Sequence, residues 1–272
     1  MQDRRSHRAG VLKYGDAAGA RVEDQLAAEE PLEIRIDGRP LTVVMRTPGH
    51  DRELALGFLF GEGIIRAAAE VAQVTVPPNG EHPDLENVID IELRPEAPGV
   101  DRRWQRNFLS ASSCGLCGVS TIDAIHQTAP PLVDDSLSID PEVIYGLDAR
   151  LRAEQAIFAR TGGLHAAGLF TAEGEPVTVR EDIGRHNAVD KVIGHAVNGG
   201  LMPLDRHILM VSGRTSFEIV QKALQARVPV LVAVSAPSSL ARDLAQTSNQ
   251  TLIGFLRGRS LNVYSGRQRI RP

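Results

Sequence analysis

Alternating apolar and polar residues near the start of the chain predict a β-hairpin. Residues 32–36 (LEIRI) and 41–45 (LTVVM) are the two strand candidates. Asp37-Gly38 lies between them and is a two-residue turn signal of the kind that joins antiparallel strands. The pattern therefore places a hairpin within the first fifty residues.

The next segments predict a short helix and one more strand. Residues 51–60 carry acidic side chains in the first turn and are followed by Gly61 and Gly63, which are helix stop signals. Residues 88–93 (VIDIEL) alternate again and predict a strand. We therefore expect residues 1–110 to form a smaller α+β domain.

The last hundred residues predict a βαβαβ unit. Apolar runs at 207–211, 228–234 and 251–256 are separated by helical segments at 217–227 and 240–247. Strands that alternate with helices in this way form parallel sheets with right-handed crossovers. The predicted fold class is α/β, with a larger C-terminal α/β domain over 120–272.

Two polar turns follow the first two strands of this unit. Residues 212–216 (SGRTS) and 235–239 (SAPSS) precede helices, where free N–H groups favour ligand binding. Neither turn contains G-x-G-x-x-G or G-x-x-x-x-G-K-[ST], which argues against a dinucleotide fold of the usual type and against a P-loop. The alternative is that these serines and threonines only cap helices.

Composition and charge narrow the function classes. The chain has 272 residues and a net charge of −4, so it can bury a large core and is not built to coat nucleic acid. Its apolar runs are far shorter than the ~18 residues that span a bilayer. The first residues are charged and no apolar segment follows, so we expect a cytoplasmic protein without membrane contact.

The charge is distributed unevenly along the chain. Residues 251–272 hold five arginines and no acidic residue. This end is either a local anion site or a solvated basic tail.

Cys114 and Cys117 are the only cysteines and form a C-x-x-C motif between serines and glycines. We expect a mobile loop over 111–119. We expect no disulfide between them, because cytosolic proteins rarely contain one. Ser120 and Asp123 match a capping box, which predicts that both sulfurs lie near a helix N-terminus, where thiolate is favoured.

Several uses of the cysteine pair compete with an incidental occurrence. A zinc site would need further ligands such as His165 or His186. The zinc deaminase signature fails, because two alanines follow His165 where the acidic residue belongs and the cysteines precede the histidine. A thioredoxin-like dithiol lacks its βαβ setting. A sulfur carrier, in which a thiolate accepts and delivers sulfur, suits a flexible arm.

Two further segments are rich in polar groups, 161–165 (TGGLH) and 180–191 (REDIGRHNAVDK). The second leads into a helix predicted over 187–197 with Asn187 as its N-cap. Asp182, Arg185 and His186 would then stand just ahead of the helix, as binding residues often do. The alternative is an ion pair between Asp182 and Arg185 beside a surface histidine.

Five motifs together resemble one known family. They are SSCGLCG at 112–118, TGGLH at 161–165, EDIGRHNAVDK at 181–191, VSGRTSFE at 211–218 and GFLRGRS at 254–260. In this order they closely resemble the FdhD family, the formate dehydrogenase accessory sulfurtransferases. The resemblance extends over nearly the whole chain, from RTPGH at 46–50 to Tyr264.

The resemblance implies a fold, a reaction and partners. The fold is a larger domain of cytidine-deaminase-like α/β/α type. The reaction takes sulfur from a cysteine desulfurase as a persulfide on Cys114, with Cys117 beside it. The sulfur passes to a bis-molybdopterin guanine dinucleotide cofactor that carries molybdenum or tungsten and serves formate dehydrogenase. The molybdenum form is Mo-bis(molybdopterin guanine dinucleotide). The protein is expected to be a cytoplasmic homodimer without a structural metal.

The resemblance and the turns also name cofactor-binding residues, with GDP as a usable fragment ligand. The family's cofactor-contacting stretch falls on Phe255, Leu256, Arg257, Gly258, Arg259 and Ser260, and the turns add Ser212, Gly213, Arg214, Thr215 and Ser235. We expect Arg257 and Arg259 to contact the cofactor, and Arg267, Arg269 and Arg271 to be exposed and to contribute little. Two other classes stay open: a zinc-dependent hydrolase and a non-catalytic cofactor-binding chaperone.

Overall fold

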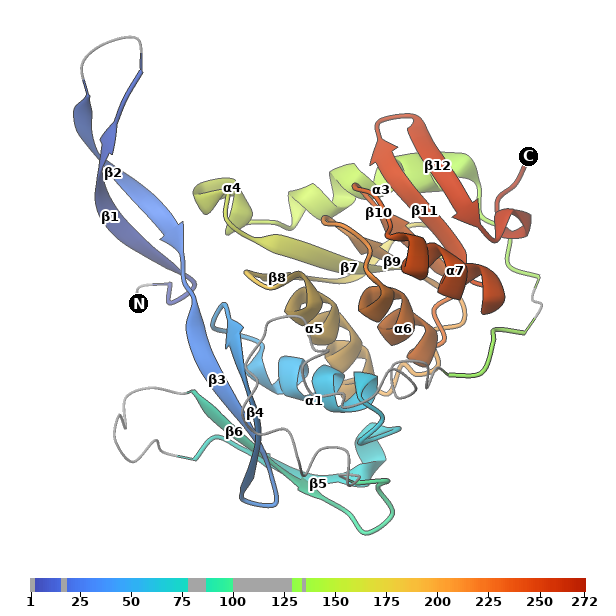
Figure 1. Cartoon of the computed structure of the whole chain (residues 1–272), viewed down its shortest axis with the longest axis horizontal. Helices are drawn as coiled ribbons and strands as arrows, with labels where there is room; N and C mark the ends of the chain where they lie inside the picture. The colour runs from blue at the N-terminus through green and yellow to red at the C-terminus, as the bar shows by residue number, and fades with distance from the viewer. Residues whose placement is uncertain (1–2, 16–18, 78–86, 100–128, 134–135) are drawn as a thin grey trace.

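The computed structural model of the chain describes residues 3–15, 19–77, 87–99, 129–133 and 136–272 (Figure 1). A six-stranded sheet has the order β12-β11-β10-β9-β7-β8. A four-stranded sheet has the order β4-β3-β6-β5, and β1 and β2 form a separate two-stranded ribbon.

The βαβαβ unit predicted from the sequence is confirmed in the six-stranded sheet. It consists of β9 (His207–Val211), α6 (Phe217–Gln225), β10 (Val230–Ala233), α7 (Ser239–Thr247) and β11 (Thr251–Arg257). The three strands pair in parallel, as their helical crossovers require. All positions of β10 are buried, which explains why its sequence is a continuous apolar run.

Three antiparallel strands complete this sheet. β7 (His165–Thr171) pairs with β9 and with β8 (Pro176–Asp182), and β12 (Ser260–Ser265) pairs with β11. The strands β8, β9, β10 and β11 therefore end at the same edge at which β7 begins. We call this edge the carboxyl edge of the sheet.

Helices cover both faces of the six-stranded sheet. On one face, α5 (Arg185–Asn198) and α6 pack against β7, β9 and β10, in one cluster of buried side chains. On the other face, α3 (Pro141–Ala153) packs on Phe170, Met210 and Ile253 in a second cluster. The structure is therefore a mixed α/β fold, as predicted. Two short helical segments, α4 (Phe158–Thr161) and the 3-10 turn Arg267–Arg269, lie at its rim.

The predicted hairpin and helix are also confirmed. β3 (Glu30–Ile36) and β4 (Arg39–Arg46) pair around Asp37 and Gly38, which both have positive φ. β6 (Val88–Leu93) runs parallel to β3, and β5 (Val71–Thr75) closes the sheet after the 3-10 turn Ala68–Glu70. The helix α1 (Asp51–Gly61) covers one face of this sheet. The division into 1–110, 111–119 and 120–272 stays a prediction.

The helices α1 and α5 cross in very close contact. A Cβ atom added to Gly57 would lie 1.8 Å from the carbonyl oxygen of Asp190, and one added to Gly194 would lie 1.7 Å from that of Glu53. Only glycine allows two helix backbones to approach this closely. The contact makes the four-stranded sheet, α1, α5 and the six-stranded sheet one packed stack with a shared core.

The ribbon was not predicted from the sequence. β1 (Ser6–Lys13) and β2 (Ala20–Ala27) project from the rest of the chain (Figure 1). Most of their side chains are exposed. A separate observation concerns membranes: no described helix combines the length and apolar character needed to cross one.

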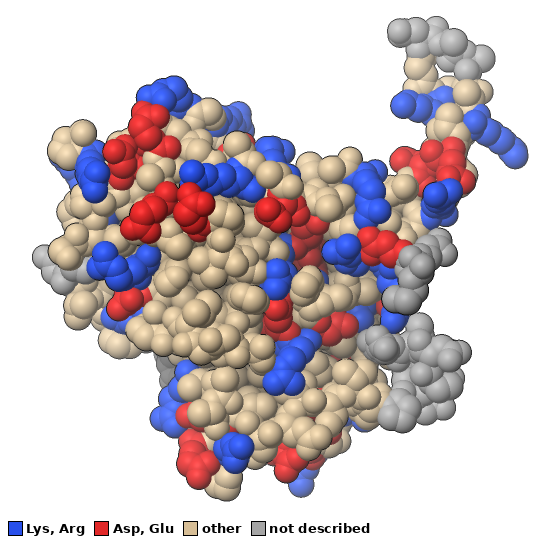
Figure 2. All heavy atoms as spheres, turned by 180° about the vertical axis from the view of Figure 1, so that it is seen from behind, with Lys and Arg blue, Asp and Glu red and all other residues tan. Residues whose placement is uncertain are grey.

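Acidic and basic side chains are interspersed on the face seen in Figure 2, without one extended patch of a single sign. This distribution agrees with the near-neutral net charge of −4.

Candidate functional site

The polar turns predicted from the sequence lie side by side along the carboxyl edge. Thr215 N in the first turn donates to Ala236 O in the second at 3.1 Å, and Ser238 N donates back to Thr215 O at 3.0 Å. On the next strand, Phe255 N donates to Ser235 O at 3.2 Å. The structure therefore brings the turns after β9 and β10 together with the end of β11, in one continuous row.

Only one of the two helices after these turns has a serine side-chain cap. Ser238 Oγ accepts from Ala241 N at 3.2 Å at the start of α7. Ser216 is the N-cap of α6, but its side chain makes no capping bond. Ser212 Oγ instead accepts from Ala166 N at 2.9 Å, which holds the first turn against β7.

A group of basic side chains lies at the other end of the row. It consists of His165 at the start of β7, Arg185 and His186 at the start of α5, and Arg214 in the first turn, and we call it the basic corner. A Cβ added to Gly213 would lie 3.2 Å from His165 Nδ1 and 3.9 Å from Arg185 Cβ, so these groups are in close proximity. Burial, with the charges of Arg185, His186 and Arg214, lowers the pKa of His165.

His186 is held by two groups of α6. Its Nε2 lies 2.9 Å from Ser216 Oγ and 3.5 Å from a carboxylate oxygen of Glu218. Burial alone would raise the pKa of Glu218, but hydrogen bonds from His186 and Ser216 outweigh it and hold that pKa at about 2. The bond to His186 explains why Ser216 does not cap its helix.

Asp182 has a structural role that the sequence did not reveal. Its carboxylate is fully buried and accepts from Thr47 N at 3.1 Å and Gly184 N at 2.8 Å. It also accepts from Asn187 Nδ2 at 2.9 Å and forms an ion pair with Lys191 Nζ at 2.7 Å. The alternative of a pair with Arg185 is therefore wrong: the partner of Asp182 is Lys191.

The predicted N-cap of α5 is corrected by the same contacts. The helix begins at Arg185 with Gly184 as N-cap and no side-chain cap. The Asn187 side chain is used elsewhere, since Nδ2 donates to Asp182 and to Met45 O at 2.7 Å. Arg185 and His186 consequently lie in the first turn of α5 and not ahead of it.

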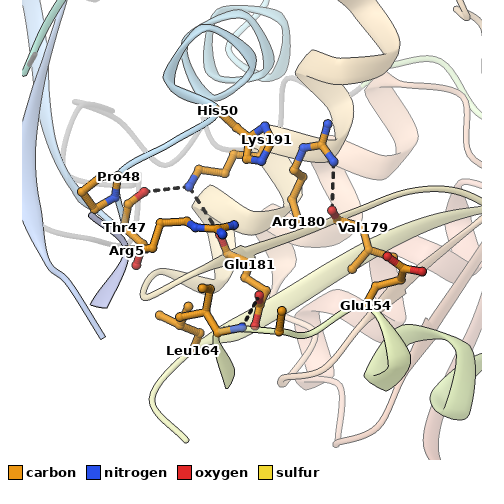
Figure 3. Close-up of a pocket in the computed structure, with 12 residues that line it drawn as sticks. Arg5, Thr47, Pro48, His50, Glu154, Leu164, Val179, Arg180, Glu181 and Lys191 are labelled. Carbon is orange, nitrogen blue, oxygen red and sulfur yellow. Dashed lines mark hydrogen bonds between the residues drawn. The ribbon is translucent and has the colours of Figure 1, made fainter. Parts of the chain in front are cut away.

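A small cavity lies between β8 and the segments that contain Arg5 and Thr47 (Figure 3). Its volume is about 70 Å³, and its lining includes the cationic side chains of Arg5, Arg180 and Lys191. Lys191 Nζ donates to Thr47 O at 2.8 Å, as Figure 3 shows. Arg180 binds the carboxylate of Glu53 at 2.8 Å. Arg5 pairs with Asp3 at 2.9 Å. Because its charges are compensated, the cavity offers a weaker anion site than the basic corner.

The stretch at the end of β11 is partly exposed. Phe255 has a positive φ of 55° and an exposed ring, which is unusual for an aromatic residue within a strand. A break in the pairing register with β12 between Gly254 and Arg257 accompanies this conformation. Leu256 is fully buried, so it is not exposed at this edge.

The arginines near the C-terminus differ from the expectation in two respects. The prediction that Arg269 is an exposed tail residue is wrong. Arg269 is 1% exposed, and its Nη1 donates to Asn249 O at 2.6 Å. Arg259 is exposed and already has a partner, since its guanidinium binds Glu142 and lies over the ring of Tyr145. The side chain of Arg257 is exposed.

The two cysteines, Cys114 and Cys117, lie outside the described residues, and so does the capping box predicted after them. Within the described part of the chain, no group of three or more His, Cys, Asp and Glu side chains is arranged to hold a metal ion.

These features define an α/β protein with a polar site at the carboxyl edge of the parallel strands β9, β10 and β11 in a mixed sheet, the usual place for a ligand beside such strands. A family model described as the FdhD/NarQ family matches residues 27–271. The chain therefore belongs to the FdhD/NarQ family.

Several curated relatives are similar over nearly their whole length. The chain is 50% identical to the sulfur carrier protein FdhD of Streptomyces avermitilis over 97% of this chain and 95% of the relative. It is 49% identical to that of Nocardia farcinica, over 100% and 97%. The protein of the same name from Sulfolobus acidocaldarius is 41% identical over 96% of each chain.

A solved structure shares the fold. The crystal structure of a proposed formate dehydrogenase accessory protein from Desulfotalea psychrophila matches with a TM-score of 0.80 at 24% identity. The match extends over 98% of this chain and all of the other.

Sequence reasoning selected much of this site but missed part of it. It selected both turns and the segments of His165 and Arg185. It did not assign Glu218, although the acidic residue two positions after Ser216 could have indicated a carboxylate at the start of α6.

Proposed function

We propose that the protein is a sulfur carrier that accepts sulfur as a persulfide on Cys114 and delivers it to a molybdenum or tungsten bis-molybdopterin guanine dinucleotide cofactor for formate dehydrogenase. The observation that carries this proposal is the near full-length similarity to proteins named sulfur carrier protein FdhD. The C-x-x-C motif supplies the thiols that the reaction needs.

The loading step is an exchange without net oxidation. The Cys114 thiolate attacks the outer sulfur of a persulfide on a cysteine desulfurase, forming a new S–S bond. The old S–S bond breaks and the desulfurase cysteine leaves as a thiolate. Cys117 is the adjacent thiol, and a homodimer in the cytoplasm is the expected state of the carrier.

The cofactor would be bound as substrate along the carboxyl edge. Ser212, Gly213, Arg214, Thr215 and Ser235 fit its phosphates, because the turns present polar groups at helix N-termini. The exposed ring of Phe255 and the side chain of Arg257 suit a guanine and its pyrophosphate. Helices on both faces of the sheet support a cytidine-deaminase-like relationship as a further part of the proposal.

Intact mass spectrometry after incubation with a cysteine desulfurase and cysteine tests the loading step. The wild-type protein should gain about 32 Da, the mass of one sulfur atom acquired by the thiolate. Cys114→Ala should not gain it, and Cys117→Ala is the matched control. An undiminished adduct in Cys114→Ala would refute the assignment.

Cofactor retention tests the binding stretch. Arg257→Ala should weaken retention by roughly 10- to 150-fold, the effect of losing one charge-assisted hydrogen bond. Arg271→Ala is the control, because that side chain is 59% exposed and lies 3.8 Å from Asp140. Equal losses in both variants would indicate a diffuse basic surface.

Metal analysis of the purified protein distinguishes the proposed sulfur carrier from the alternative, a zinc-dependent hydrolase. That enzyme would hold about one zinc ion per chain. A cofactor-binding chaperone, the second alternative, would bind GDP but would not need the thiols.

A further inference from the structure

The ribbon of β1 and β2 projects from the rest of the chain, but its base is held firmly (Figure 1). At the base, Asp3 pairs with Arg160 at 2.7 Å, and Ala28 N donates to Arg5 O at 2.9 Å. Thr47 Oγ1 donates to Ala28 O at 3.0 Å. A two-stranded hairpin without further packing is only marginally stable in water, so a projecting ribbon of this length gains stability when a partner covers it.

The two faces of the ribbon differ in character. Residues that are paired directly across an antiparallel ribbon share one face, and successive pairs alternate between the faces. The face that we call the apolar face consists of His7, Ala9, Val11 and Lys13 on β1 and Ala20, Val22, Asp24 and Leu26 on β2. Val22 and Leu26 are 38% and 49% exposed. The opposite face carries an ion pair between Arg8 and Glu23 at 3.0 Å, so the apolar face is the one that gains more from burial.

Two opposite charges stand symmetrically on the apolar face. Val11 and Val22 form its central pair, Lys13 lies two residues towards the tip, and Asp24 lies two residues towards the base. The two charges are about 14 Å apart along the ribbon, which is too far for an ion pair within one chain. Neither side chain forms an ion pair with a described residue, and Asp24 Oδ1 accepts from Gln25 N at 2.8 Å. Turning the ribbon by 180° about the central pair exchanges the two positions, so the face is complementary to itself.

We propose that two copies of this chain associate through the apolar faces of their ribbons, which pack face to face and antiparallel. A two-fold axis between the two Val11–Val22 pairs places Lys13 of each copy over the Ala9–Asp24 pair of the second copy. Packed sheets lie about 10 Å apart, a distance that lysine and aspartate side chains can bridge together. The same patch then serves both copies, as two-fold interfaces require. The inference rests on the proposed function only in its expectation of a homodimer, and it assigns the surface that forms one.

Charge reversal at either position tests the interface. Sedimentation velocity of the full chain over the micromolar range should show a dimer that both Lys13→Asp and Asp24→Lys weaken. Each variant turns two attractive contacts into repulsive ones, so the dissociation constant of the dimer should rise about 10-fold or more. Arg21→Asp makes the same change of charge on the opposite face and is the matched control. A dimer that all three variants form equally well would overturn the interface, and so would a wild-type protein that is monomeric at high micromolar concentration.

Mixing the two variants tests the antiparallel arrangement. Lys13→Asp has acidic groups at both positions and Asp24→Lys has basic groups at both. An equal mixture should therefore form heterodimers with an affinity near that of the wild type, and the double variant should regain self-association. A mixture that associates as weakly as the single variants would overturn the arrangement.

Val22→Asp tests the apolar centre of the same face. It should abolish the dimer at concentrations where the wild type is dimeric, because it puts two carboxylates next to the two-fold axis. Leu12→Asp, on the opposite face, is the matched control. Both side chains are exposed, so the melting temperature of the protein should change little in either variant. Equal self-association of the two variants would overturn the interface.

Persulfide loading of the wild type is a separate readout of the proposed function. A loaded protein whose self-association is insensitive to the apolar face would overturn the interface alone. A protein that dimerises through this face but is not loaded would overturn the proposed function alone.

Discussion

Replacing Asp182 by asparagine should destabilise the protein strongly, because four donors converge on its carboxylate. Each oxygen accepts two hydrogen bonds: Oδ1 from Gly184 and Asn187, and Oδ2 from Thr47 and Lys191. An asparagine NH₂ group would face two donors in either orientation.

The magnitude follows from burial. Lys191 is 1% exposed and would lose the carboxylate that lies 2.7 Å from its Nζ. Removing one partner of a buried ion pair costs about 3–5 kcal/mol. For a chain of this size, 1 kcal/mol corresponds to roughly 2–4 °C, so the melting temperature should fall by roughly 6–20 °C.

Urea denaturation of the wild type, Asp182→Asn, Lys191→Met and the double variant measures this effect. The double variant should lose less stability than the sum of the single variants, because no charge is left unpaired. Asp243→Asn is the control, since Asp243 is 60% exposed and pairs with its neighbour Arg242. A loss below about 1 kcal/mol for Asp182→Asn would refute the reasoning.

Two other predictions concern packing and pH. Gly57→Ala and Gly194→Ala should each lower the free energy of unfolding by about 1–3 kcal/mol or more, because the new methyl group meets backbone of the facing helix; chemical denaturation checks this, and wild-type stability in either variant would contradict the close crossing. The folded-state pKa of Glu218 is depressed from 4.5 to about 2, so its stabilisation is present above pH 4.5 and is lost as the pH falls towards 2. Glu218→Gln should therefore show a shallower loss of melting temperature over that window, and identical pH profiles would exclude the contribution.

The sequence predicted most accurately the elements whose burial leaves a clear pattern of apolar residues. The hairpin around Asp37 and the βαβαβ unit bury one face or a whole strand, so their patterns are strong. The ribbon strand β2 (ARVEDQLA) exposes both faces and therefore has no periodic signal to detect.

The errors in the site have a common physical cause, which is contact between residues distant in sequence. Asparagine is a common N-cap residue, but the side chain of Asn187 donates to Asp182 and Met45 instead. Arg269 lies near the C-terminus, where an exposed side chain was expected, but its hydrogen bond to the carbonyl oxygen of Asn249 holds it in the interior. Local sequence rules treat each segment alone and do not include such partners.

The glycine crossing of α1 and α5 has a consequence for exchanging parts between relatives. A chimera that takes its first half from one family member and its second half from another separates Gly57 from Gly194. A side chain at either position in one parent would press on backbone supplied by the other. Functional chimeras are therefore expected only when the parent of the first half has glycine at position 57 and the parent of the second half has glycine at position 194, whatever their overall identity.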